Sequence, residues 1–160
     1  MTAELALAAL HEALDAQRQS RGLSWARVER EIGVSAATLR GMRERGTAEG
    51  DGVLQALRWL GRSPESFLRD GTVTRGEDEA LPAPASGVLR FDARAIHEAL
   101  EARRVERGMT WRQVASDIGM ASAASLTRLR EGGRVSFPEV MRIFAWLGQP
   151  AARFVRITDH

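Results

Sequence analysis

The chain has 160 residues, of which 44% are hydrophobic and 28% charged, and its formal net charge is +2, values that are ordinary for one medium or two small globular domains. It contains no cysteine, which excludes disulfides, thiolate metal sites and a cysteine nucleophile. No run approaches the roughly 18 apolar residues of a membrane span, and the opening MTAELALAAL has no positively charged leader, so we expect a cytoplasmic protein.

The first predicted helix runs from near Thr2 to Arg21. Its apolar stripe consists of Leu7, Leu10 and Leu14, which recur at helical spacing on one face. Gly22 follows directly and is expected to end the helix, because glycine adopts the left-handed conformation that closes a helix at the least steric cost.

Two short amphipathic helices joined by a tight turn are predicted for LSWARVEREIGVSAATLRGMRE, residues 23–44. Ser24 and Ser35 are expected to cap the two helices through their hydroxyl oxygens, and Gly33 is expected to end the first one. In the second helix Leu39 and Met42 share the inward side. The opposite side, at about 100° per residue, is then the presented face.

The rest of the first half is predicted to be a glycine-rich loop, a fourth helix from Val53 to Leu60 and a short fifth helix that begins at Ser63 and Pro64. Residues 71–87 lack periodicity and contain two prolines, which is typical of a linker. Such a segment spans roughly 23 Å as a flexible coil, although docking of its apolar residues onto the units is an alternative. Those apolar residues are Val73, Leu81 and Val88.

An internal repeat covers most of the chain and predicts two units, residues 1–70 and 88–160, on either side of the linker. Residues 10–33 align with residues 96–119 without gaps, and residues 39–69 align with residues 126–156 after one extra residue in the second turn. The second unit has Thr110 and Ser122 at the cap positions and opens with Asp92 as an N-cap. Units of this size are near the lower limit for unaided folding, so mutual support between them is expected.

The order of cap, short helix, glycine turn, cap and second helix resembles the Cro and phage-repressor helix-turn-helix family. The resemblance extends over both copies, and it implies an all-α protein of two tandem five-helix domains of the lambda-repressor type, binding double-stranded DNA. Two positions depart from the family pattern: the first motif helix begins with Trp25 or Trp111 where the family often has Gln, and Arg43 and Arg130 stand where it often has Glu.

Residues on the presented faces are the candidates for reading bases, because side chains on that face of a second motif helix reach the major groove. They are Ala37, Arg40, Gly41 and Glu44 in the first unit, and Ala124, Thr127, Arg128 and Glu131 in the second. Arg128 aligns with Gly41, so the two units are expected to read different bases. Arginine is the only basic residue besides histidine, so every cationic side-chain contact to phosphate must come from Arg.

Side chains at the helix ends are the candidates for binding phosphate, a contact that positions a protein without reading sequence. They are Trp25, Arg27, Ser35, Arg43, Arg45, Trp111, Arg112, Gln113, Ser122, Arg130 and Arg134. For both tryptophans a core position is the stronger interpretation. Residues 88–160 carry twelve Arg against eight acids, whereas residues 1–70 carry ten of each, so the second unit is expected to contribute more of the salt-dependent affinity.

The sequence therefore predicts a DNA-binding transcription regulator, acting as a repressor by occluding its site. The alternative is a protein-interaction module, of the anti-activator or antitoxin type, whose recognition helices no longer bind DNA. A homodimer or a protein partner is compatible with either function. Catalytic and metal sites are not expected, and no cofactor is implied: His11 and His97 are equivalent in the repeat but lack further ligands at metal spacing.

Overall fold

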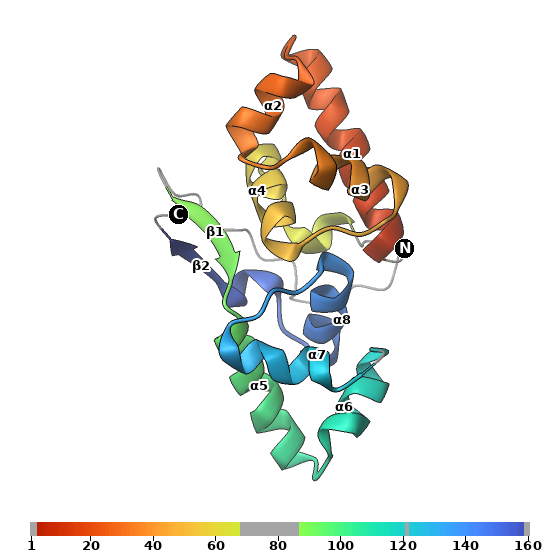
Figure 1. Ribbon diagram of the computed structural model, residues 1–160, viewed down its shortest axis with the longest axis vertical. Helices are drawn as coiled ribbons and strands as arrows, with labels where there is room; N and C mark the ends of the chain where they lie inside the picture. The colour runs from red at the N-terminus through yellow and green to blue at the C-terminus, as the bar shows by residue number, and fades with distance from the viewer. Residues whose placement is uncertain (1–2, 68–86, 121, 159–160) are drawn as a thin grey trace.

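A computed structural model describes residues 3–67, 87–120 and 122–158. The protein is mostly helical, and its two halves form two lobes stacked along the long axis (Figure 1). The first lobe consists of α1 (Ala3–Ser20), α2 (Trp25–Ile32), α3 (Ala36–Glu44), α4 (Gly50–Leu60) and the 3-10 helix η1 (Pro64–Phe67). The second consists of β1 (Val88–Phe91), α5 (Ala93–Glu106), α6 (Trp111–Ile118), α7 (Ala124–Thr127), η2 (Arg128–Glu131), α8 (Phe137–Leu147), η3 (Ala151–Phe154) and β2 (Val155–Thr158).

The caps of α2 and α3 in the first lobe are the predicted ones. The Ser24 hydroxyl accepts a hydrogen bond from the Arg27 N–H at 3.1 Å, and Ser35 accepts one from the Thr38 N–H at 3.2 Å. Gly33 closes α2 in the left-handed conformation with φ 79°. Each cap satisfies an N–H group that a helix end otherwise leaves unpaired.

From α5 to Gly119 the second lobe has the same order of helices and caps as the first, and after Gly119 the two copies diverge. Thr110 and Gln113 form a reciprocal capping box at the start of α6. The prediction that Ser122 caps the next helix was wrong: Ala123 holds the cap position with no side-chain hydrogen bond. The extra residue in this turn shifts the cap, and α7 gives way after one turn to the 3-10 helix η2.

The fold is mainly helical, as expected, and it also contains one antiparallel pair of strands that the sequence analysis did not predict. β1 pairs with β2 in a register that places Leu89 opposite Ile157 and Arg90 opposite Arg156. The segment before α5 contains Val88 and Phe91, and both residue types are enriched in strands. Residues 155–158 supply the second strand of the pair.

Polar side chains of α4 cover the other edge of β1. Asp51 accepts a hydrogen bond from the Phe91 N–H at 2.8 Å, Gln55 bonds to both the N–H and the C=O of Leu89, and Arg58 donates to the Gly87 C=O at 3.0 Å. Spacings of four and three residues place these side chains on one face of α4. The first lobe thus satisfies strand backbone groups of the second, which fixes the two lobes relative to each other.

The residues that open the two lobes occupy equivalent positions of the repeat but have different secondary structures. By the alignment, residues 3–6 correspond to residues 89–92, yet the first set begins α1 and the second forms most of β1. The elements that contain these segments both contact the opposite lobe: α1 packs against α8, and β1 packs against α4. The sequence AELA favours a helix, whereas Val88 and Phe91 are residue types enriched in strands, and hydrogen bonds to α4 and β2 complete the strand.

The junction between the lobes has approximate twofold symmetry. Gly50 N–H donates to Val135 C=O and Phe137 N–H donates to Ala48 C=O, both at 2.8 Å. In the repeat, Gly50 aligns with Phe137 and Ala48 aligns with Val135. The two hydrogen bonds therefore join equivalent pairs of residues, with the lobes exchanged. Elements also meet their own counterparts, α4 against α8 and η1 against η3. This is the pattern of an isologous dimer interface within one chain.

One hydrophobic cluster includes buried residues of both lobes, among them Leu54 and Leu57 of α4 and Phe137 and Phe144 of α8. α4 begins at Gly50 rather than at the predicted Val53, because the junction holds the residues just before it. The domain boundary expected at residues 71–87 lies outside the described residues except for Gly87, as do Val73 and Leu81. Among the described helices, none has the length and apolar content that crossing a membrane requires.

Candidate nucleic-acid interface

The outward face of α3 presents three of the four residues predicted for it. Ala37, Arg40 and Glu44 are exposed, and Leu39 and Met42 are buried on the opposite side. The prediction for Gly41 was wrong. Gly41 is buried because the Arg45 side chain and the Thr47 backbone cover it, and a Cβ there would lie 2.9 Å from the Arg45 guanidinium.

The corresponding face in the second lobe is divided between α7 and η2. Ala124, Thr127, Arg128 and Glu131 are all exposed, as predicted. Arg128 donates to the Ser125 hydroxyl at 3.3 Å, and Thr127 donates to the Ala124 C=O at 3.1 Å. The 3-10 turn shifts the direction of the side chains after Thr127, so the second face is not a copy of the first.

Most of the side chains predicted to bind phosphate lie on the surface. Those with exposed side chains are Arg27, Ser35, Arg43, Arg45, Arg112, Gln113, Ser122, Arg130 and Arg134. Some already have partners within the chain: Arg27 pairs with Glu31 at 3.0 Å and Arg43 with Glu44 at 2.9 Å. The hydrogen bond from Arg43 holds the pKa of the Glu44 carboxyl below its usual value.

Trp25 and Trp111 are half-buried and each is stacked between a histidine and an arginine. The His11 and Trp25 ring centroids lie 5.1 Å apart, and the Arg18 guanidinium lies 5.0 Å from the Trp25 centroid on the ring face. The second lobe repeats the stack with His97 at 5.0 Å and Arg104 at 5.2 Å from Trp111. Stacking on both copies explains why histidine occurs at equivalent positions.

Each stack is anchored by a carboxylate on the first helix of its lobe. Asp15 accepts two hydrogen bonds from Arg18, and Glu101 accepts two from Arg104. The sequence offered a signal for these stacks, namely the repetition of His, acid, Arg and Trp at matching positions, but the signal does not say that the groups are in contact. The stacks fix the angle between the first helix and the start of the motif in both lobes.

The stacked histidines predict a loss of stability in mild acid. Burial, the largest cause, lowers the pKa of His11 and of His97 below 6.5, and Arg43 and Arg130 lower them further. A lowered pKa means that the folded protein binds the proton less tightly than the unfolded chain. Stability is therefore complete above about pH 6.5 and declines as the pH falls from there.

The measurement is the free energy of unfolding in urea between about pH 7.5 and about pH 5.5, where carboxylates remain ionised. We expect a decline in the natural protein and a flatter profile after His11→Gln and His97→Gln together. An equal slope in both proteins would show that the histidines do not carry the effect.

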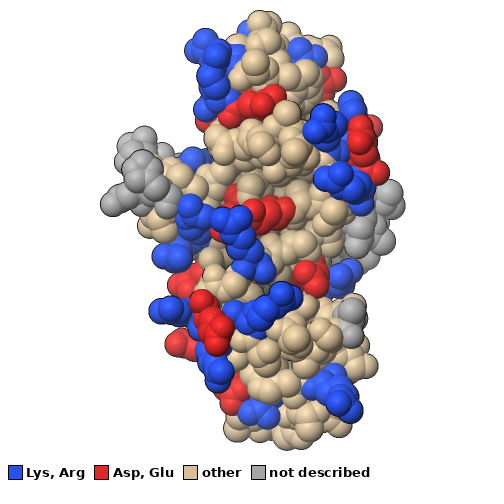
Figure 2. Space-filling view, viewed as in Figure 1, with Lys and Arg blue, Asp and Glu red and all other residues tan. Residues whose placement is uncertain are grey.

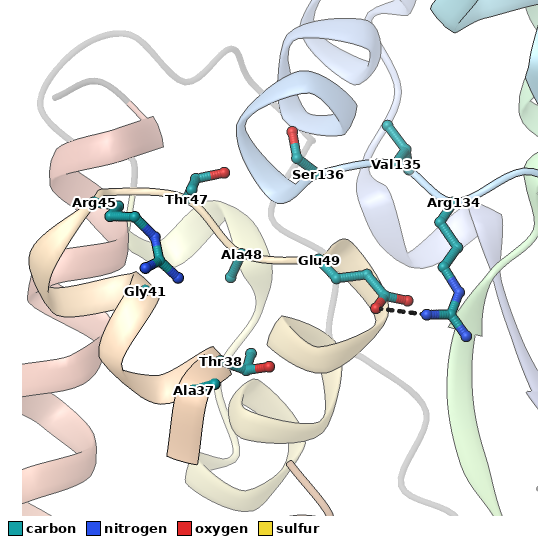
Figure 3. A pocket seen from close by; sticks show the side chains of 10 residues that line it. All are labelled: Ala37, Thr38, Gly41, Arg45, Thr47, Ala48, Glu49, Arg134, Val135 and Ser136. Carbon is teal, nitrogen blue, oxygen red and sulfur yellow. Dashed lines mark hydrogen bonds and ion pairs between the residues drawn. The ribbon is translucent and has the colours of Figure 1, made fainter. Parts of the chain in front are cut away.

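A pocket of about 370 Å³ adjoins the junction of the lobes on the side of α3. Figure 3 shows Ala37 and Thr38 of α3 on one wall and Arg134 to Ser136 of the other lobe across from them. Arg134 donates to Glu49 at 3.2 Å across the junction.

Charge on this side is mixed rather than uniformly basic. Figure 2 shows basic groups on both lobes and at the waist, with acidic groups between them. In the described parts of the chain, no cluster of three His, Cys, Asp or Glu side chains has the arrangement of a metal site. The exposed groups therefore provide hydrogen-bond donors and acceptors for a polar partner.

Comparison with protein-family models, curated proteins and solved structures finds no match to the chain.

Proposed function

We propose that this protein binds duplex DNA sequence-specifically and regulates transcription, acting as a repressor through two helix-turn-helix units of the Cro and phage-repressor type. One observation carries the proposal. Both lobes join a capped helix to a second short helix through a left-handed glycine, Gly33 or Gly119, and leave the outward side of that second helix exposed.

The twofold junction refines the proposal. Because the lobes are related by an approximate twofold axis, the two motif units are expected to meet half-sites in inverted orientation. Arg40 and Arg128 are not equivalent in the repeat, and Arg128 lies in the 3-10 turn. The two half-sites are therefore expected to differ in sequence.

The test is selection from random duplex DNA with the complete chain, followed by affinity measurements across a salt series. We expect enrichment of two unlike half-sites in inverted orientation, and an affinity that falls linearly with salt on logarithmic axes. Absence of both enrichment and salt dependence would refute DNA binding.

Substitution of the two exposed arginines provides the residue-level test. Arg40→Ala and Arg128→Ala are each expected to reduce the preference at one base pair by about 1–3 kcal/mol, the value of a bidentate contact with guanine. Neither change is expected to alter stability by more than about 0.5 kcal/mol, because both side chains are exposed. The measurement is binding to single-mismatch duplexes.

The matched control is Arg30→Ala, which removes an exposed arginine from α2 outside the two presented faces. It is expected to leave base preference unchanged. If Arg40→Ala and Arg128→Ala behave like this control, the presented faces do not read DNA bases.

A protein-interaction module is the second candidate, and the carboxylates on the presented side favour it. Glu44 and Glu49 pair with Arg43 and Arg134 and so reduce the positive charge available to a duplex. In this alternative the outward sides of α3 and α7 contact a protein.

A further inference from the structure

A second groove, of about 750 Å³, lies at the waist beside the strands. Four arginines line it: Arg90 of β1, Arg94 of α5, Arg134 of the loop before α8, and Arg156 of β2. Figure 2 shows basic groups gathered at the waist on the side of the strands. The volume lies within the range of small-ligand sites.

Two of these arginines stand directly opposite each other in the sheet. Arg90 and Arg156 are cross-strand partners, so their side chains share one face of the strand pair. Like charges directly opposite each other in an antiparallel pair are destabilising. An anion bound between them would turn this repulsion into attraction.

The arginines differ in whether a side chain of the protein already pairs with their guanidinium group. Asp51 pairs with Arg90 at 3.5 Å, and the Thr158 hydroxyl accepts from Arg90 at 3.2 Å, which orients the guanidinium. The side chains of Arg94 and Arg156 make no ion pair or hydrogen bond with any residue that the structure describes. All the N–H donors of these two guanidinium groups are therefore available to a ligand.

Two of the carboxylates that line the groove are occupied by backbone donors. Asp51 accepts from the Phe91 N–H at 2.8 Å, and Asp92 accepts from the Ala95 N–H at 3.1 Å. Glu131 is exposed at the rim. The groove therefore favours an anion despite the acids around it.

We infer that this groove binds phosphate groups, with Arg90, Arg94 and Arg156 as the principal contacts. Arginine presents a planar fork of donors that matches phosphate oxygens. The phosphate belongs either to a small phosphorylated molecule or to the backbone of bound DNA. The three arginines lie on the strands and α5, outside the base-reading faces, and only Glu131 at the rim belongs to such a face. Binding of pyrophosphate to these arginines therefore does not depend on the proposed function.

The test titrates the complete chain with inorganic pyrophosphate and follows the heat of binding. Arg156→Gln is expected to weaken binding about tenfold, the loss that follows from one charged hydrogen-bond partner. Arg30→Gln changes the net charge equally on an exposed surface of α2 and is expected to leave binding unchanged. Glu131→Gln is expected to strengthen binding, because it removes the acid at the rim.

Thermal unfolding separates binding from folding. Arg156→Gln is expected to keep or raise the unfolding temperature, since it removes the repulsion with Arg90. A variant that folds and fails to bind pyrophosphate therefore supports the site.

The source of the phosphate is distinguished by the salt dependence of duplex DNA binding. If Arg156→Gln reduces the slope of log affinity against log salt by about one, the groove holds the DNA backbone. If the slope is unchanged and pyrophosphate binding is weakened, the ligand is a small phosphorylated molecule. If Arg156→Gln matches Arg30→Gln in both measurements, no phosphate site exists, whether or not the protein binds DNA.

Discussion

Gly50→Ala is expected to destabilise the protein by about 1–3 kcal/mol, the usual cost of forcing an extra group into a packed site. A Cβ at Gly50 would lie 2.9 Å from two ring carbons of Phe91 and 3.0 Å from the Val135 carbonyl oxygen. Phe91 is only 5% exposed and the Val135 carbonyl accepts the Gly50 N–H, so neither neighbour can move without disturbing the junction.

The matched control is Gly52→Ala in the same helix. A Cβ at Gly52 meets Thr38 Cγ2 at 3.4 Å, an ordinary contact, and alanine is favoured over glycine inside a helix by about 1 kcal/mol. The measurement is urea or thermal unfolding of both variants, with about 2–4 °C expected for each kcal/mol. Equal stability of the two variants would show that Phe91 does not pack against α4 as described.

The second large effect concerns the spacing of the DNA half-sites. If the proposed function is right, insertion of either about five or about ten base pairs between the half-sites is expected to reduce affinity about a hundredfold or more. About ten base pairs restore the same face of the duplex but move the second half-site by roughly 34 Å. A rigid junction cannot follow that displacement.

Two units joined only by a flexible linker behave differently in this experiment. They lose affinity on the shorter insertion and recover it on the longer one, because the linker can stretch. Competition between duplexes of the three spacings measures the effect. Recovery at the longer spacing would show that the lobes separate on DNA.

Features set by neighbouring residues could be predicted from the sequence. Ser24, Ser35 and Thr110 cap helices, and Gly33 and Gly119 close them, because each depends on a backbone bond or conformation a few residues away. The burial of Leu39 and Met42 followed from helical spacing in the same way.

Features set by residues far apart could not be predicted. The strand before α5 depends on α4 side chains and on the C-terminal residues, so periodicity within that segment does not reveal it. Gly41 was assigned to the presented face from helical angle alone, yet Arg45 folds back over it. The junction was beyond prediction because it joins aligned positions, Glu49 and Ser136, that the sequence gives no reason to pair.

The isologous junction has a consequence for how the protein responds to its own concentration. In a homodimer, a contact of this kind forms only as the subunit concentration rises, and occupancy of a two-part site is then steep. Here both halves of the contact belong to one chain, so its formation does not vary with dilution. Occupancy of any ligand that spans the two lobes therefore rises hyperbolically, with graded rather than switch-like saturation.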